Sequence, residues 1–250
     1  MARKRNNRRR SRGSLSFLWK PLGFLVAIVA MAAAVTLFFR MDHITVTGMQ
    51  RYTEQEVLDA SRLELGSNLY LINKFEVRDR IFTQLPYVEE VRINRRLPDT
   101  LAIEVFECEP TAAVEDGDGV WLVSVHGKLL ERTDAPPTGC PLITGAPLVE
   151  PAVSAQADFG EDAAYRAEVA RTVLQEAQER GLREKVASID LSDDTALSME
   201  YMGRFTVRFP WTADVRYKWE SLATVVDYLE ANETGTIDLM TEGKASFIPK

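Results

Sequence analysis

The sequence predicts an α+β protein: a single N-terminal transmembrane helix, a small β-α-α-β-β unit, and a second α+β unit with a mainly antiparallel sheet. Three observations predict it. Residues 21–39 carry no charged side chain, the next seventy residues alternate between strand and helix patterns, and the remainder combines hairpin signals with two amphipathic helical stretches. We therefore divide the chain into a basic tail (1–20), a membrane helix (21–40) and two folded units (41–109 and 110–250).

The apolar segment is long enough to cross a bilayer. As a helix its nineteen residues would measure about 28 Å, close to the thickness of the hydrocarbon core. Its Leu, Ile, Val and Phe side chains would favour insertion by roughly 3–6 kcal/mol. A cleaved signal peptide is the alternative, because Ala30, Ala32, Ala33 and Ala34 offer cleavage sites. The apolar run continues beyond these alanines to Phe39, which favours an uncleaved anchor.

Charge is distributed unevenly on the two sides of this segment. Residues 1–20 contain eight Lys and Arg and no acid, so the positive-inside rule places them in the cytoplasm and residues 41–250 outside. The outer part has 21 Lys and Arg against 37 Asp and Glu, a net charge of −16. Such a surface repels nucleic acid, which is therefore not an expected partner. The tail is expected to contact anionic lipid, with a specific cytoplasmic partner as the open alternative.

The first folded unit is expected to place two helices on one face of a three-stranded sheet. Apolar and polar residues alternate in its strands, and Pro86 stops its second helix. The expected elements are a strand at 43–47, a helix begun by a capping box at Thr53 and Glu56, a helix at about 73–85, a strand from 88, and a return strand over 101–106.

The second unit begins after Pro110, where the pattern changes. The expected elements are a hairpin with strands 120–123 and 128–130, a helix near 162–180, strands at 186–191, 196–202 and 205–209, a helix near 213–231, and a last strand near 236–240. Cys108 and Cys140 form either one bridge or, more in keeping with their small number, two separate buried thiols.

Motifs for chemistry are absent from the sequence. It contains no G-x-S-x-G, S-x-x-K, H-E-x-x-H, C-x-x-C or Walker A pattern. The run Asp116 to Gly119 suggests calcium, but it lacks the spacing of a calcium loop and is interpreted as an acidic hairpin tip. The sequence therefore predicts no enzyme, no metal and no cofactor.

Several short motifs, in order, resemble a known domain. They are Ile44-x-Val46-x-Gly48, Leu65-Gly66-x-Asn68-Leu69, Leu85-Pro86-Tyr87-Val88 and Val91-x-Ile93-x-Arg95-x-Leu97-Pro98-x-Thr100-Leu101. Together they resemble a POTRA domain. Later landmarks are Gly127-Lys128-Leu129-Leu130, Pro141-Leu142-Ile143-x-Gly145 and Ile237-Asp238-Leu239, and with the anchor they resemble the FtsQ/DivIB family of bacterial cell-division proteins. Cys108 departs from the family, which usually has Arg at that position.

The resemblance implies a non-enzymatic divisome scaffold in the cell membrane at the division septum. It would bind FtsB/DivIC-like and FtsL-like coiled-coil proteins outside the membrane, together with other divisome components, and help regulate septal peptidoglycan synthesis. The alternatives are a POTRA-containing transport or assembly factor, which normally carries a β-barrel or several POTRA copies, and a membrane-anchored cell-wall enzyme.

The partner site is expected on the last strand, because an edge strand offers unpaired N–H and C=O groups to an added strand and the resemblance implies recruitment there. The expected partner-binding residues are Thr236, Ile237, Asp238, Leu239 and Met240, with Thr241 and Phe247 nearby.

Overall fold

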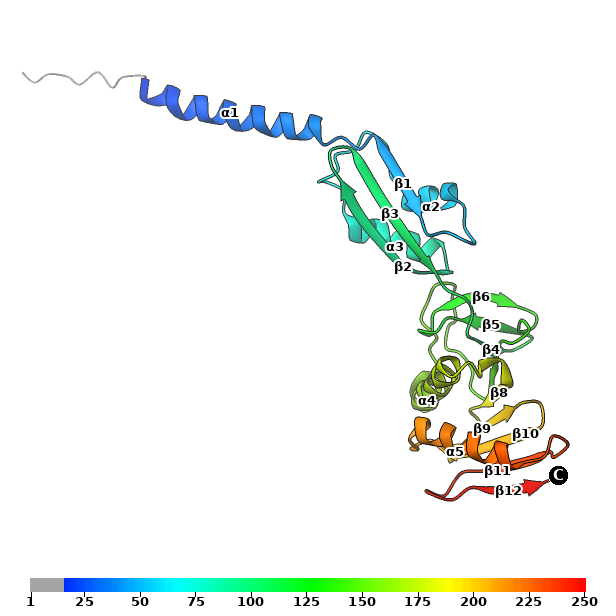
Figure 1. Ribbon diagram of the computed structural model, residues 1–250. Helices are drawn as coiled ribbons and strands as arrows, with labels where there is room; N and C mark the ends of the chain where they lie inside the picture. The colour runs from blue at the N-terminus through cyan, green and yellow to red at the C-terminus, as the bar shows by residue number, and fades with distance from the viewer. Residues whose placement is uncertain (1–15) are drawn as a thin grey trace, which may run out of the picture.

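The computed structural model describes residues 16–250, so most of the predicted basic tail lies outside the described residues. A long helix, α1 (Ser16–Phe38), projects away from the two folded units (Figure 1). Large apolar side chains along it are exposed, among them Leu22, Phe24 and Leu25. Within the described part of the chain, no helix has the length and apolar character that crossing a membrane requires.

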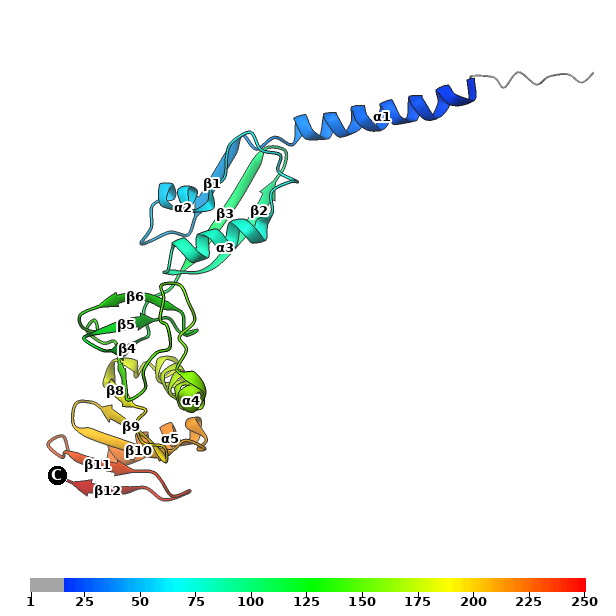
Figure 2. The ribbon, with the colours of Figure 1, turned by 180° about the vertical axis from the view of Figure 1, so that it is seen from behind.

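The first folded unit has the predicted β-α-α-β-β order. Its elements are β1 (His43–Thr47), α2 (Glu54–Ser61), α3 (Lys74–Gln84), β2 (Val88–Arg96) and β3 (Thr100–Glu107). The strand order is β1-β3-β2, in which β1 pairs parallel and β2 antiparallel with the central β3. Figures 1 and 2 show both helices on the same face of this sheet, as predicted.

Carboxylates fix the loop that leads into α2. The capping box is present: the Thr53 hydroxyl accepts from the Glu56 N–H at 3.3 Å, and the Glu56 carboxylate accepts from the Thr53 N–H at 2.8 Å. Glu107, at the end of β3, accepts three further backbone N–H groups from residues 50–52, at 3.1, 2.7 and 3.1 Å. One side chain thus holds the β1–α2 loop against the strand that leaves the unit.

The second unit is built on a nine-stranded sheet. Its elements are β4 (Ala112–Asp116), β5 (Gly119–Val123), β6 (Leu129–Thr133), β7 (Leu142–Thr144), α4 (Gly160–Glu179), η1 (Arg183–Lys185), β8 (Val186–Asp190), β9 (Ala196–Tyr201), β10 (Phe205–Pro210), α5 (Val215–Tyr228), β11 (Gly235–Asp238) and β12 (Ser246–Pro249). The strand order is β12-β11-β10-β9-β8-β7-β4-β5-β6.

This sheet is mixed: five of its eight strand pairs are antiparallel, as the expectation of a mainly antiparallel sheet requires, and the other three are not. Three of its eight strand pairs are parallel: β10 with β11, β4 with β7, and β7 with β8. Strands β4, β7 and β12 were not predicted from the sequence. Two of the parallel pairs arise because α4 lies between β7 and β8 and α5 between β10 and β11, so each helix is the crossover that a parallel pair needs. The third pair, β4 with β7, is joined by a crossover that contains β5 and β6 instead of a helix.

One continuous core lies between this sheet and the two helices. It includes Val173 and Leu174 of α4, and Trp219 and Leu222 of α5. A smaller cluster covers the other side of β4 to β6, where alternate residues point away from the helices. That cluster contains Tyr87, Ala113, Val120, Leu122 and Leu130, with both cysteines packed against it as free, half-buried thiols. Burial raises the pKa of the Cys108 thiol to about 12.

Polar contacts join the two units at this smaller cluster. Lys128 is buried, and its Nζ donates to the carbonyl oxygens of Phe82 at 3.1 Å and Val88 at 3.0 Å. Burial lowers the pKa of Lys128 to about 8. The Tyr87 hydroxyl donates to the Glu131 carboxylate at 2.6 Å. A buried cation with two carbonyl acceptors fixes one unit against the other at this junction.

Candidate partner-binding edge

The strand that contains residues 236–238 lies inside the sheet. β11 pairs parallel with β10 on one side and antiparallel with β12 on the other. The prediction that this is the final, edge strand is therefore wrong. After β11 the chain turns back through Gly243, and a four-residue strand takes the edge. The only sequence signal for that strand is the pair Phe247 and Ile248, two residues of high β-propensity after a turn glycine.

Two of the predicted partner-binding residues belong to the core. Ile237 and Leu239 are buried. The Leu239 N–H donates to the Arg208 carbonyl at 2.8 Å, and its carbonyl accepts from the Lys218 Nζ at 2.6 Å. Its backbone is therefore not available to another chain. The other predicted residues are half-buried or exposed: Thr236, Asp238, Met240 and Phe247 are half-buried, and Thr241 is exposed.

β12 presents a row of backbone groups to solvent. The Lys250 N–H donates to the Thr234 carbonyl at 3.0 Å, and Thr236 is directly opposite Ile248. Hydrogen-bonded and non-hydrogen-bonded pairs alternate along an antiparallel ladder. The backbone N–H and C=O groups of residues 246, 248 and 250 therefore point toward β11. The N–H and C=O of Phe247 consequently point away from the sheet. Its side chain packs inward, with the Phe205 ring 6.1 Å away in an edge-to-face arrangement.

The opposite edge of the sheet is partly covered. β6 begins at Leu129, whose N–H donates to the Ala155 carbonyl at 2.8 Å and whose carbonyl accepts from the Ser154 N–H at the same distance. The next residues of this segment continue the contact, because Lys128 and Gln156 form an isolated antiparallel bridge. The segment at 154–157 therefore acts as a cover for the start of β6. β12 has no such cover among the described residues.

A surface groove lies where the chain leaves β11. Its walls come from the start of α5 and from the turn between β11 and β12, including Tyr217, Met240 and Glu242. Tyr217 is 44% exposed, and it offers a broad apolar ring to this groove.

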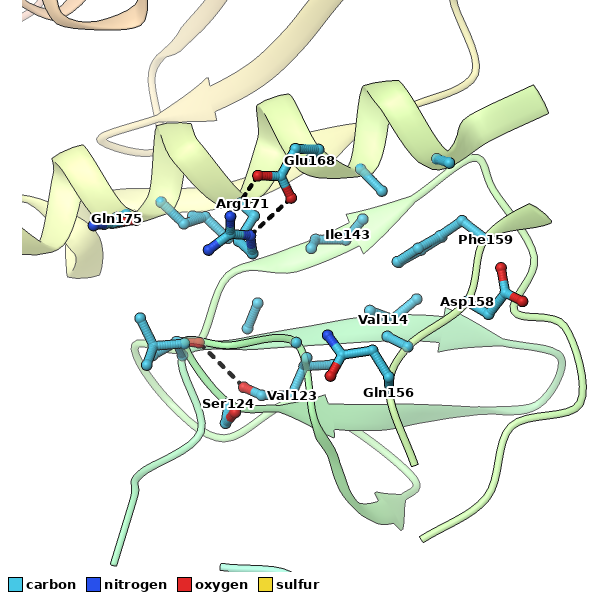
Figure 3. A pocket seen from close by; sticks show the side chains of 18 of the residues that line it. Val114, Val123, Ser124, Ile143, Gln156, Asp158, Phe159, Glu168, Arg171 and Gln175 are labelled. Atoms are coloured by element: carbon cyan, nitrogen blue, oxygen red, sulfur yellow. Dashed lines mark hydrogen bonds and ion pairs between the residues drawn. The ribbon is translucent and has the colours of Figure 1, made fainter. Parts of the chain in front are cut away.

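A second hollow lies between α4 and the sheet and has a cavity volume of about 180 Å³ (Figure 3). Aliphatic side chains, including Val114, Val123 and Ile143, form its floor, and a Glu168–Arg171 ion pair lies on α4 above it. Two hydroxyl groups line it: the Thr111 hydroxyl donates to the Val123 carbonyl at 3.2 Å, and the Ser124 oxygen accepts from the N–H groups of His126 and Lys128, both at 3.3 Å. Within residues 16–250 no group of His, Cys, Asp and Glu is placed to hold a metal.

Comparison with known families accounts for most of the chain. Residues 39–107 match the POTRA domain of the FtsQ type. Residues 112–240 match the C-terminal domain of the cell division protein FtsQ/DivIB, which is more than half of the chain. The chain belongs to the FtsQ/DivIB family. It is accordingly a non-enzymatic cell-division protein, and its first folded unit is the FtsQ-type POTRA domain.

Individual relatives agree with this assignment. The chain is 31% identical over 128 residues to the cell division protein FtsQ of Corynebacterium glutamicum, a match that covers 50% of this chain and 57% of that one. It is 29% identical over 94 residues to DivIB of Clostridium acetobutylicum, covering 38% and 37%. A match to FtsQ of Novosphingobium aromaticivorans is 30% identical over 111 residues, covering 44% and 34%. The chain thus spans between about a third and 57% of the length of these relatives.

Proposed function

We propose that this FtsQ/DivIB protein is a divisome scaffold that binds FtsB/DivIC-like and FtsL-like coiled-coil proteins outside the membrane and so helps regulate septal peptidoglycan synthesis. The observation that carries the proposal is the open edge of β12. A short exposed strand with outward N–H and C=O groups is the geometry to which a partner strand adds. The family assignment supports the division context.

In recognition by strand addition, β12 contacts the partner directly and β11 supports β12. The main chain of Phe247 pairs with the partner, and Ile248, which is 57% exposed, contributes side-chain contact. Pro249 has no N–H to donate, so it limits pairing at that end of the strand. The core residues Ile237 and Leu239 act indirectly, because they hold β11 as the support on which β12 lies. The half-buried and exposed residues Thr236, Asp238, Met240 and Thr241 border the site.

We place the protein in the cell membrane with a single anchor at residues 21–40. The support is the uncharged sequence of residues 21–39 and the asymmetry of basic residues on its two sides. The tail at 1–20 is then cytoplasmic, and the POTRA unit (41–109) and the second unit (110–250) lie outside. Figure 1 shows β12 at the far end of the molecule from α1, so partner contact occurs away from the membrane surface.

Two measurements on the full chain test this proposal. A fluorescent protein fused to the N-terminus should concentrate at the division septum. Protease added to protoplasts should digest the two folded units and leave an N-terminal tag intact, because moving the tail's positive charges outward costs about 2.3 kcal/mol per charge and 100 mV. A uniform membrane signal during division would contradict the division role, and digestion of the tag would contradict the topology.

A further inference from the structure

Exposed apolar side chains gather at one end of the POTRA unit. Over residues 41–107, all of which the structure describes, six large apolar side chains are exposed. Two of these, Phe75 and Phe106, lie away from the end of the unit that adjoins α1, against the guanidinium groups of Arg78 and Arg92 on α3 and β2. The other four come from the α2–α3 loop and from the turn after β2: Leu65 (64% exposed), Tyr70 (50%), Leu71 (82%) and Leu97 (55%). Tyr70 also has a guanidinium neighbour, because Arg95 lies over its ring at 5.7 Å. We call these four residues the α1-proximal surface.

Backbone hydrogen bonds tie the α2–α3 loop to the end of α1. Phe39 follows the helix directly, and its carbonyl accepts from the Leu69 N–H at 2.9 Å. Two residues later the Met41 N–H donates to the Ser67 carbonyl at 2.8 Å. The rings of Phe39 and Tyr70 meet edge to face at 4.9 Å. The loop therefore lies beside the point at which the chain leaves α1, without a free linker between them.

The turn that carries Leu97 lies at the same end. The Asp99 carbonyl accepts from the N–H groups of Asp42 and His43, at 2.9 and 3.2 Å. These are the residues that lead into β1, directly after the α1 junction. Figures 1 and 2 show this end of the three-stranded sheet nearest to α1. Two separate segments thus bring apolar side chains to the exit of the helix.

Acidic residues do not predominate around this end, in contrast to the acidic exterior as a whole. The guanidinium of Arg95 donates to the carbonyls of Leu69 and Ile72, at 2.6 and 3.0 Å, which holds the loop in place. The segments that meet at this end carry the basic residues Arg40, Arg62, Lys74, Arg95 and Arg96 and the acidic residues Asp42, Glu64 and Asp99. An anionic headgroup layer would meet little net repulsion here, and the exposed arginines can reach phosphates.

We infer that the α1-proximal surface rests in the headgroup region of the bilayer beside α1. The occupant follows from continuity, because the apolar surface of α1, with Phe38 67% exposed at its end, leads directly into this surface. Apolar and tyrosine side chains with arginine neighbours suit the boundary between headgroups and acyl chains, at a depth of roughly 5–10 Å. This contact sets the angle at which the POTRA unit leaves the membrane. The inference rests on the proposed anchor.

Tryptophan quenching in the full chain tests the contact. In a Trp19→Phe background, which removes the tryptophan of α1, Leu71→Trp and Leu97→Trp place reporters on the α1-proximal surface. Phe106→Trp is the matched control on the same unit. Each variant is reconstituted in vesicles of phosphatidylethanolamine and phosphatidylglycerol, with and without bromine on the acyl chains. The reporters at 71 and 97 should lose emission in brominated vesicles after subtraction of the background, and the reporter at 106 should not.

Co-flotation of the chain with the vesicles distinguishes a failure of the proposed anchor from a failure of the contact at the α1-proximal surface. A chain that does not float overturns the proposed anchor and this contact together. A chain that floats, with reporters at 71 and 97 that are not quenched, overturns the contact alone and leaves the anchor standing. Equal quenching at 106 would mean that the unit lies flat on the bilayer, which also overturns the arrangement inferred here.

Discussion

Replacing Phe247 by proline and, separately, by alanine should distinguish main-chain pairing at β12 from side-chain contact. Both variants lose the ring that packs on Phe205. Because this ring is only half-buried, each should lose about 1–2 kcal/mol of unfolding free energy, less than the 3–5 kcal/mol of a fully buried phenylalanine. Proline should add little to that loss, because the N–H it removes points away from β11 and proline is tolerated at such edge positions.

Partner binding should separate the two variants. The proline variant cannot donate to the partner strand, which leaves a partner carbonyl buried and unpaired at a cost of about 1–3 kcal/mol. Phe247→Pro should therefore bind roughly tenfold to a hundredfold more weakly than Phe247→Ala. The assay is titration of the full chain with the extracytoplasmic part of a DivIC-like partner, with circular dichroism to confirm matched folding. Equal affinity of the two folded variants would refute recognition by strand addition at β12.

Two further predictions concern the support of this edge and the junction between the units. In Gly235→Ala, the added Cβ would overlap the Ile248 carbonyl oxygen, so β12 should detach in part. Partner binding should then weaken, and proteolysis near the C-terminus should accelerate. Unchanged partner binding and unchanged resistance to protease would contradict this prediction. Since the pKa of Lys128 falls from 10.5 to about 8 on folding, the unfolded chain binds its proton more tightly. Unfolding free energy should rise between these two pH values by at most about 3 kcal/mol relative to Lys128→Met, as measured by urea denaturation. Parallel pH profiles of the two proteins would contradict a lowered pKa of Lys128 in the folded chain.

Local patterns determined the first folded unit almost completely. The capping box at Thr53 and Glu56 sets the start of α2, and period-two alternation marks β2 and β3. These signals are short in range, since each depends on side chains within a few residues of one another. The short motifs of the sequence also led to the correct family, FtsQ/DivIB. The acidic run from Asp116 to Gly119 was correctly interpreted as a hairpin tip, which joins β4 to β5.

Only the tertiary structure decided which strand lies at the edge of the second sheet. The residues at 236–240 have an ordinary strand pattern, and nothing in that pattern states how many neighbours the strand has. Strand pairing depends on chain segments far apart in sequence: β11 packs beside β10 across the whole of α5, and the short β12 closes over it. The α1-proximal surface was hidden for the same reason. Leu71 and Leu97 are unremarkable apolar residues in sequence, and only the folded sheet brings them to one end, because β1 and the turn after β2 meet there through backbone hydrogen bonds.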